Sequence, residues 1–225
     1  MIRYDFVDDP DGCVALERGA RKYDEAMGYS DPADKAKRID CFRQAEALYL
    51  KAAEKGNPIA YLNLGYVYSY DRCEGVYYGD VQHVESGADW PAPFPCEERA
   101  FACFQMAAEA EIAEGCYKLG DMYKHGTGCD PDAVRAFECY MSAAKLSELD
   151  EPVIWGSVAL RLGDAYENGF GCEQSFERAH HWYKKAETCL EIAVNAGDWY
   201  YRRALSNARN GVKRTAQELQ LNDIM

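Results

Sequence analysis

A stripe of alanine and aromatic residues recurs four times along the chain. Each copy reads Ala-x-x-x-aromatic-x-x-Ala, and the copies are Ala45/Tyr49/Ala52, Ala100/Phe104/Ala107, Ala136/Tyr140/Ala143 and Ala179/Tyr183/Ala186. Residues at i, i+4 and i+7 lie on one face of an α-helix. The polar residues between them fall on the other faces. The pattern therefore predicts four amphipathic helices of one kind.

A second helical phrase precedes three of these stripes. It places Leu-Gly at its centre and Tyr three residues after the Gly, at Leu64-Gly65-Tyr68, Leu119-Gly120-Tyr123 and Leu162-Gly163-Tyr166. A glycine inside a helix costs about 1 kcal/mol relative to alanine, so its recurrence requires a packing reason. We expect a neighbouring helix to cross where the side chain is missing. The two phrases together predict pairs of antiparallel helices.

The spacing of the phrases divides the chain into units. From the Leu-Gly glycine to the next stripe there are 16 residues in two units, but 35 from Gly65 to Ala100. We therefore expect a single repeat domain over 1–225, with units at about 11–57, 58–112, 113–150 and 151–187, an insertion at 71–95 and capping helices in 188–225. Asp132 and Ser175 precede their stripes by four residues and are expected to be N-caps.

These phrases resemble the Sel-like repeat family, a branch of the tetratricopeptide superfamily. The resemblance is carried by GCYKLGDMYKHGTGCDPDAVRAFECYMSAA (115–144), by VALRLGDAYENGFGCEQSFERAHHWYKKAE (158–187), and by AYLNLGYVY (60–68) with RAFACFQMAA (99–108). It implies an all-α fold, a right-handed α/α superhelical solenoid of antiparallel helix pairs. It also implies a non-catalytic scaffold or adaptor that binds a peptide or protein segment in its concave groove.

Helix geometry indicates which residues face such a groove. On the first helix of each pair, positions three before and one after the glycine point away from the core stripe, and further groove positions follow one turn later. The predicted groove residues are Leu62, Tyr66, Tyr70, Tyr117, Asp121, Lys124, Leu160, Asp164 and Glu167. Tyrosines mixed with carboxylates suit a peptide with basic and apolar groups. An ordinary exposed helix face is the alternative reading.

The 71–95 insertion contains four further aromatic residues. They are Tyr77, Tyr78, Trp90 and Phe94, close to three prolines. Such a loop can bind a partner, or it can pack its own aromatics against adjacent helices. Both interpretations stay open from the sequence.

The net charge of −13 restricts the class of partner. Phosphate binding relies on a basic surface, so nucleic acid and anionic membranes are not expected, and a basic partner is. No apolar run is long enough to span a membrane, and the N-terminus lacks a basic leader with an apolar stretch, so we expect a cytoplasmic location unless a native leader is missing.

The C-terminal segment differs from the rest of the chain in charge. Residues 199–225 carry a net +3, against −16 on the remainder. A solvated basic helix end explains this, and weak head-to-tail self-association is the alternative. Trp199, Tyr200 and Leu205 are expected on the inner side of a capping helix here.

Candidate chemistry is sparse. The ten cysteines include no Cys-x-x-Cys pair, and several share a repeat position, which is typical of small buried residues rather than of disulfides or metal ligands. His180 and His181 are adjacent and point in different directions, and His180 is expected to be packed. We therefore expect no metal, no cofactor and no enzyme activity. A hydrolase built on cysteine or carboxylates is the alternative function.

Overall fold

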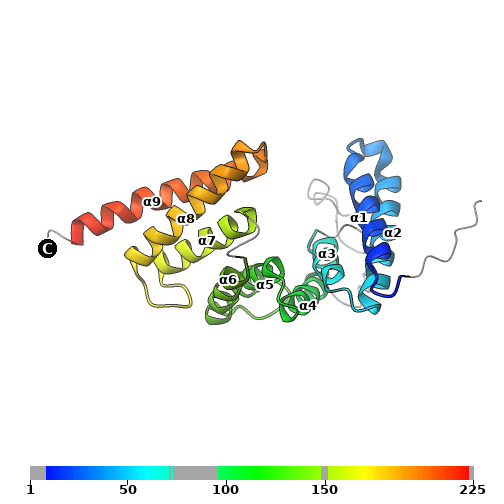
Figure 1. Ribbon diagram of the computed structural model, residues 1–225, viewed down its shortest axis with the longest axis horizontal. Coiled ribbons are helices and arrows are strands. Elements are labelled where there is room, and N and C mark those ends of the chain that lie inside the picture. The colour runs from blue at the N-terminus through cyan, green and yellow to red at the C-terminus, as the bar shows by residue number, and fades with distance from the viewer. Residues whose placement is uncertain (1–8, 71, 73–95, 148–151, 223–225) are drawn as a thin grey trace, which may run out of the picture. The chain divides into compact units, whose positions relative to one another are not determined.

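The computed structural model describes residues 9–70, 72, 96–147 and 152–222, and within these ranges it contains nine α-helices and no strand (Figure 1). The fold is an all-α helical repeat, as predicted. The chain separates into two compact units, Met1–Ala110 and Glu111–Met225. The insertion residues Tyr77, Tyr78, Trp90 and Phe94 lie outside the described residues.

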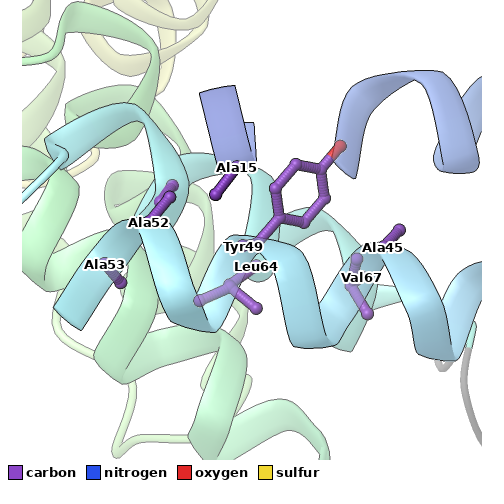
Figure 2. Close-up of a cluster of buried hydrophobic side chains, with 8 residues drawn as sticks. Ala15, Ala45, Tyr49, Ala52, Ala53, Leu64 and Val67 are labelled. Atoms are coloured by element: carbon purple, nitrogen blue, oxygen red, sulfur yellow. The ribbon is translucent and has the colours of Figure 1, made fainter. Parts of the chain in front are cut away.

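The first unit contains four helices. They are α1 (Cys13–Gly28), α2 (Lys35–Glu54), α3 (Pro58–Ser69) and α4 (Cys96–Glu109), with a short 3-10 turn at Pro32–Asp34. Helix α2 packs between α1 and α3, and α3 also packs on α4. Figure 2 shows the core of this unit, in which the ring of Tyr49 lies among Ala15, Ala45 and Leu64.

The second unit contains the remaining five helices. They are α5 (Ala113–His125), α6 (Ala133–Ser147), α7 (Pro152–Asn168), α8 (Phe176–Asn195) and α9 (Arg202–Asn222), with a 3-10 turn at Trp199–Tyr201 before α9. Neighbouring helices pair in chain order, and α9 also contacts α7.

The aromatic residue of each stripe packs directly on the glycine of the preceding helix. A Cβ added to Gly65 would lie 2.5 Å from Phe104, and one added to Gly120 would lie 2.6 Å from the ring of Tyr140. Gly163 meets Tyr183 and Gly19 meets Tyr49 in the same way, also at 2.6 Å. Such distances are too short for any side chain, so these glycines are required by close packing, as predicted.

The turns between paired helices also follow the sequence. Asp132 accepts a hydrogen bond from the Arg135 amide at 3.0 Å, and Ser175 accepts one from the Arg178 amide at 3.3 Å, which confirms both N-caps. Gly171 adopts a φ of +69°, and a Cβ there would meet the carbonyl oxygen of Ala133. Only glycine fits that position.

The C-terminal cap differs from the sequence expectation. Leu205 is buried as expected, but Trp199 and Tyr200 are 71% and 70% exposed rather than on the inner side. The reason is local: α8 continues to Asn195, and Gly197 with a φ of +101° turns the chain so that Trp199 and Tyr200 face solvent while Tyr201 packs inward. The inner face of α9 consists instead of Leu205, Ala208, Gly211 and Thr215.

Candidate functional site

The two predicted groove aspartates of the second unit are held by the stripe tyrosines. The hydroxyl of Tyr140 donates to Asp121 at 2.8 Å, and that of Tyr183 donates to Asp164 at 2.6 Å. Each aspartate directly follows the glycine on which the same tyrosine ring packs. In each repeat the tyrosine ring therefore fills the space beside the glycine, and the hydroxyl of the same tyrosine binds the adjacent carboxylate.

Asp121 also forms a two-point ion pair with Arg161 of α7. The guanidinium Nε and Nη2 approach the two carboxylate oxygens at 2.6 and 2.5 Å, and Nη1 donates to the carbonyl oxygen of Ser157. Burial alone would raise the pKa of Asp121, but the charge of Arg161 and the hydrogen bonds outweigh it and hold the pKa below its ordinary value. The Arg161 guanidinium in turn lies 4.7 Å from the centre of the Tyr117 ring.

Glu167 is engaged by the last helix. Arg214 of α9 binds its two oxygens at 2.8 and 2.7 Å, and the Tyr183 hydroxyl donates to it at 2.5 Å. The hydrogen bond from Arg214 is the main reason that the pKa of Glu167 lies below its ordinary value. The three predicted groove carboxylates are thus all bound within the chain.

The remaining predicted residues differ in how much surface they offer. Leu62 and Tyr117 are buried, at 8% and 6% exposure, so the expectation that their position points away from the packed side chains is wrong for both. For Tyr117 the reason is the cover that Arg161 provides. Leu160 is half-buried, and the half-buried Lys124 places its ammonium 5.7 Å from the Phe170 ring centre.

In the first unit the predicted groove tyrosines form a stack. The rings of Tyr66 and Tyr70 lie 6.2 Å apart and nearly parallel, and the edge of Tyr66 packs against Phe104. The guanidinium of Arg72 lies 4.8 Å from the centre of the Tyr70 ring. Both tyrosines are half-buried.

The structure therefore brings the predicted residues together in separate groups within the two units. Sequence reasoning missed the residues that join them, which are Tyr140, Arg161, Tyr183 and Arg214. One signal in the Leu-Gly phrases could have identified the tyrosines: aspartate follows Gly120 and Gly163, whose stripe aromatic is Tyr, whereas Tyr66 follows Gly65, whose stripe aromatic is Phe104. No comparable signal marks the arginines.

The candidate chemistry of the sequence finds little support among the described residues. They include no group of three His, Cys, Asp or Glu side chains that could hold a metal ion. The nine described cysteines are free thiols, and burial raises the pKa of Cys103 and Cys139 to about 12. His180 is half-buried and its Nδ1 lies 2.9 Å from the hydroxyl of Thr215, a packed position as predicted.

Comparison with known proteins identifies the family to which this helical repeat belongs. The family model of the Sel1 repeat matches residues 26–57, 58–78, 97–111, 113–148 and 157–188, which is more than half of the chain. The chain belongs to the Sel1 repeat family. The resemblance inferred from the Leu-Gly and Ala-aromatic phrases is thereby confirmed.

Two solved structures are similar to this Sel1 repeat chain. A Sel1 repeat protein from Oxalobacter formigenes is 23% identical, with a TM-score of 0.48, over 63% of this chain and 88% of that one. The protective antigen c5321 of uropathogenic Escherichia coli, described as having an SLR fold, is 18% identical, with a TM-score of 0.41, over 93% of this chain and 46% of that one. No curated protein matches the chain.

The matched repeats indicate what members of this family generally do, and they name no partner. Sel1 repeat proteins generally mediate interactions between proteins and are generally non-catalytic scaffolds. Among the described residues, no helix is both long and apolar enough to cross a membrane. The cytoplasmic location expected from the sequence stays a prediction.

Proposed function

We propose that this Sel1 repeat chain is a non-catalytic scaffold that binds segments of other proteins on the first helices of its repeats, α3 in the first unit and α5 and α7 in the second. The observation that carries the proposal is the family match over five segments, which include α3, α5 and the part of α7 from residue 157 onward. The half-buried stack of Tyr66 and Tyr70 supports it, because rigid aromatic rings supply contact area at a low cost in conformational entropy.

The partner segment is proposed to be basic. The support is the net charge of −13, since the summed field of an acidic protein attracts cations over about a Debye length, ~10 Å at 0.1 M salt. Asp121, Asp164 and Glu167 contribute less than free carboxylates would, because each is already bound within the chain. The charge preference is therefore expected to be broad and to weaken as salt is added.

Displayed random peptides selected against the whole chain test the proposal. We expect the selected peptides to carry net positive charge, and Tyr70→Ala to weaken their binding about tenfold, the loss typical of an interface aromatic. The matched control is Glu138→Ala on α6, an exposed residue outside the proposed face. Peptides that bind Tyr70→Ala as tightly as the parent would place the binding face elsewhere. Charge reversal at Asp121 or Asp164 is unsuitable as a test, because both positions hold the fold together.

Weak head-to-tail self-association remains a separate proposal. Arg209 pairs with Glu187 and Glu191, and Arg214 pairs with Glu167, so these two charges are used within the chain. Sedimentation at low and high salt tests the idea, and a salt-independent monomer at high protein concentration would dispose of it.

A further inference from the structure

The turn between α8 and α9 exposes two large aromatic side chains. Trp199 is 71% exposed and Tyr200 70%, the highest values among the exposed large hydrophobic residues that the structure describes. Aromatic surface that stays in water gains no stabilisation from burial, and exposed apolar patches often mark sites of interaction.

The turn that carries these side chains is itself well anchored. Gly197 bonds back to Val194, Asp198 to Ala193, and Tyr201 to Asp198 through backbone hydrogen bonds. Tyr201 packs inward, against the cluster that contains Leu205. Backbone hydrogen bonds and the packing of Tyr201 thus hold the turn in place. The ring of Tyr200 contacts that of Tyr201 at 5.4 Å between centroids, yet most of its surface stays exposed.

Two unpaired cations adjoin the aromatics. Arg202 and Arg203 are exposed, and neither side chain forms an ion pair or hydrogen bond with any residue in the described ranges. They are the first two residues of α9, where positive charge opposes the helix dipole and does not stabilise the helix. Arg209 and Arg214, later in the same helix, are both paired.

We propose that Trp199, Tyr200, Arg202 and Arg203, the turn patch, bind an acidic segment of another protein that also carries aromatic or apolar side chains. Charge complementarity selects the occupant: carboxylates pair with the two free guanidinium groups, and apolar side chains cover the two rings. Trp, Tyr and Arg are also the residue types that dominate binding energy at protein interfaces. The turn patch is a separate site from the one proposed on the first helices, because its partner is acidic and the partner proposed there is basic.

A copolymer of glutamate and tyrosine is a suitable probe, with its binding to the intact chain followed by fluorescence anisotropy. Two variants remove the patch: Arg202→Glu with Arg203→Glu, and Trp199→Ser with Tyr200→Ser. We expect each to bind the copolymer at least about tenfold more weakly than the parent. The matched control is Lys213→Glu, which changes the charge of another exposed residue on α9 about 15 Å along the helix and should bind like the parent.

Several results would overturn the proposal. They are equal binding of the glutamate–tyrosine copolymer by the parent and both patch variants, and binding to phosphatidylserine vesicles without binding to the glutamate–tyrosine copolymer. A second copy of the chain is the alternative occupant, and sedimentation of the parent and the patch variants tests it. If the parent self-associates but does not bind the copolymer, and the patch variants no longer self-associate, the patch is a contact between copies instead. Circular dichroism equal to that of the parent shows that the variants are folded. Binding of basic peptides reports separately on the groove.

Discussion

At the scale of single residues, the stripe tyrosines of the second unit have two functions. The rings of Tyr140 and Tyr183 fill the space left by Gly120 and Gly163, while their hydroxyls bind Asp121 and Asp164. Burial, reinforced by the adjacent carboxylate, raises the pKa of both hydroxyls, so they remain protonated donors at any physiological pH. Helix packing and a partly buried hydrogen bond are thus supplied by one side chain.

The glycine contact predicts an unusual sign for a glycine-to-alanine substitution. Inside a helix this change normally stabilises, by about 1 kcal/mol. Gly120→Ala should instead destabilise the chain by about 1–3 kcal/mol, because the new Cβ would lie 2.6 Å from the Tyr140 ring. Urea denaturation measures the free energy of unfolding. Gly28→Ala is the control, since nothing lies within 4 Å of that position, and an equal response of the two variants would refute the packing argument.

The ion pair between Asp121 and Arg161 predicts a pH dependence of stability. Asp121→Asn should cost about 1–3 kcal/mol at neutral pH, less than the ~3–5 kcal/mol of a fully buried pair. The discount follows from exposure, which is 26% for Asp121 and 25% for Arg161. The pKa of Asp121 is lowered in the folded chain, so its contribution is complete above the unfolded pKa of about 3.9 and disappears as the pH falls through the lower folded pKa.

Parallel denaturation of parent and variant from neutral to acid pH measures this effect. The difference between them should be constant above about pH 5 and shrink below about pH 4. Asp130→Asn, at an exposed aspartate nearby, should show no such difference. A gap between parent and Asp121→Asn that persists at the lowest accessible pH would mean that the ion pair is not its source.

The residue scale also shows what the sequence could and could not predict. Helical periodicity identified the close-packed glycines and the caps at Asp132 and Ser175, because both depend on neighbours within one repeat. The partners Arg161 and Arg214 were missed, since they lie 40 and 47 residues from the carboxylates they bind. Periodicity gives the face of a side chain but not the long residue that reaches it from another helix. The sequence therefore predicts an acidic groove but does not show that two of its carboxylates are paired with arginines.

At the scale of elements, α9 is the part of the fold that the repeat pattern did not specify. It packs on α8 through Gly211, where an added Cβ would lie 2.6 Å from Tyr183, so this ring is covered by glycine from both α7 and α9. Its sequence contains no Leu-Gly phrase, and the preceding Gly197 and Tyr200 mimic the repeat spacing. Because of this similarity, the sequence predicts Trp199 and Tyr200 on the inner side of the capping helix, which is wrong.

The position of Gly211 predicts that α9 can be displaced by one substitution. In Gly211→Leu the new side chain would clash with Tyr183, so α9 should lose most of its protection against hydrogen exchange while α7 and α8 retain theirs. Exchange followed by mass spectrometry resolves the two regions. Gln217→Leu adds the same side chain at an exposed position of α9 and should keep the parent pattern. Undiminished protection of α9 in Gly211→Leu would contradict the packing of α9 on Tyr183 through Gly211.

At the scale of the whole molecule, the cysteines bear on the question of catalysis. Burial raises the pKa of Cys41, Cys103, Cys116, Cys129, Cys139, Cys172 and Cys189. A nucleophilic cysteine requires the opposite shift, because the thiolate is the reactive form. None of these seven thiols has the lowered pKa of a nucleophile. Cys41 and Cys116 are buried, as expected from the sequence, but the other five are only half-buried.

Thiol labelling of the native chain tests this interpretation. With iodoacetamide at pH 8, we expect these seven cysteines to react much more slowly than in urea, and the exposed Cys13 to react fastest among the described thiols. Peptide mapping by mass spectrometry assigns the rates. One buried thiol that reacts faster in the native chain than in urea would revive the hydrolase alternative.

The contacts of α9 also determine how this array can change in length. Thr215, Arg209 and Arg214 bind His180, Glu187 and Glu167 of the last repeat. The same repeat positions in the preceding pair hold Phe137, Ala144 and Lys124, which offer a ring, a methyl group and a repelling cation. The modules are consequently not interchangeable. A gene duplication that lengthens the array can copy an internal repeat only upstream of α7, and the α7–α8 pair must keep the final place.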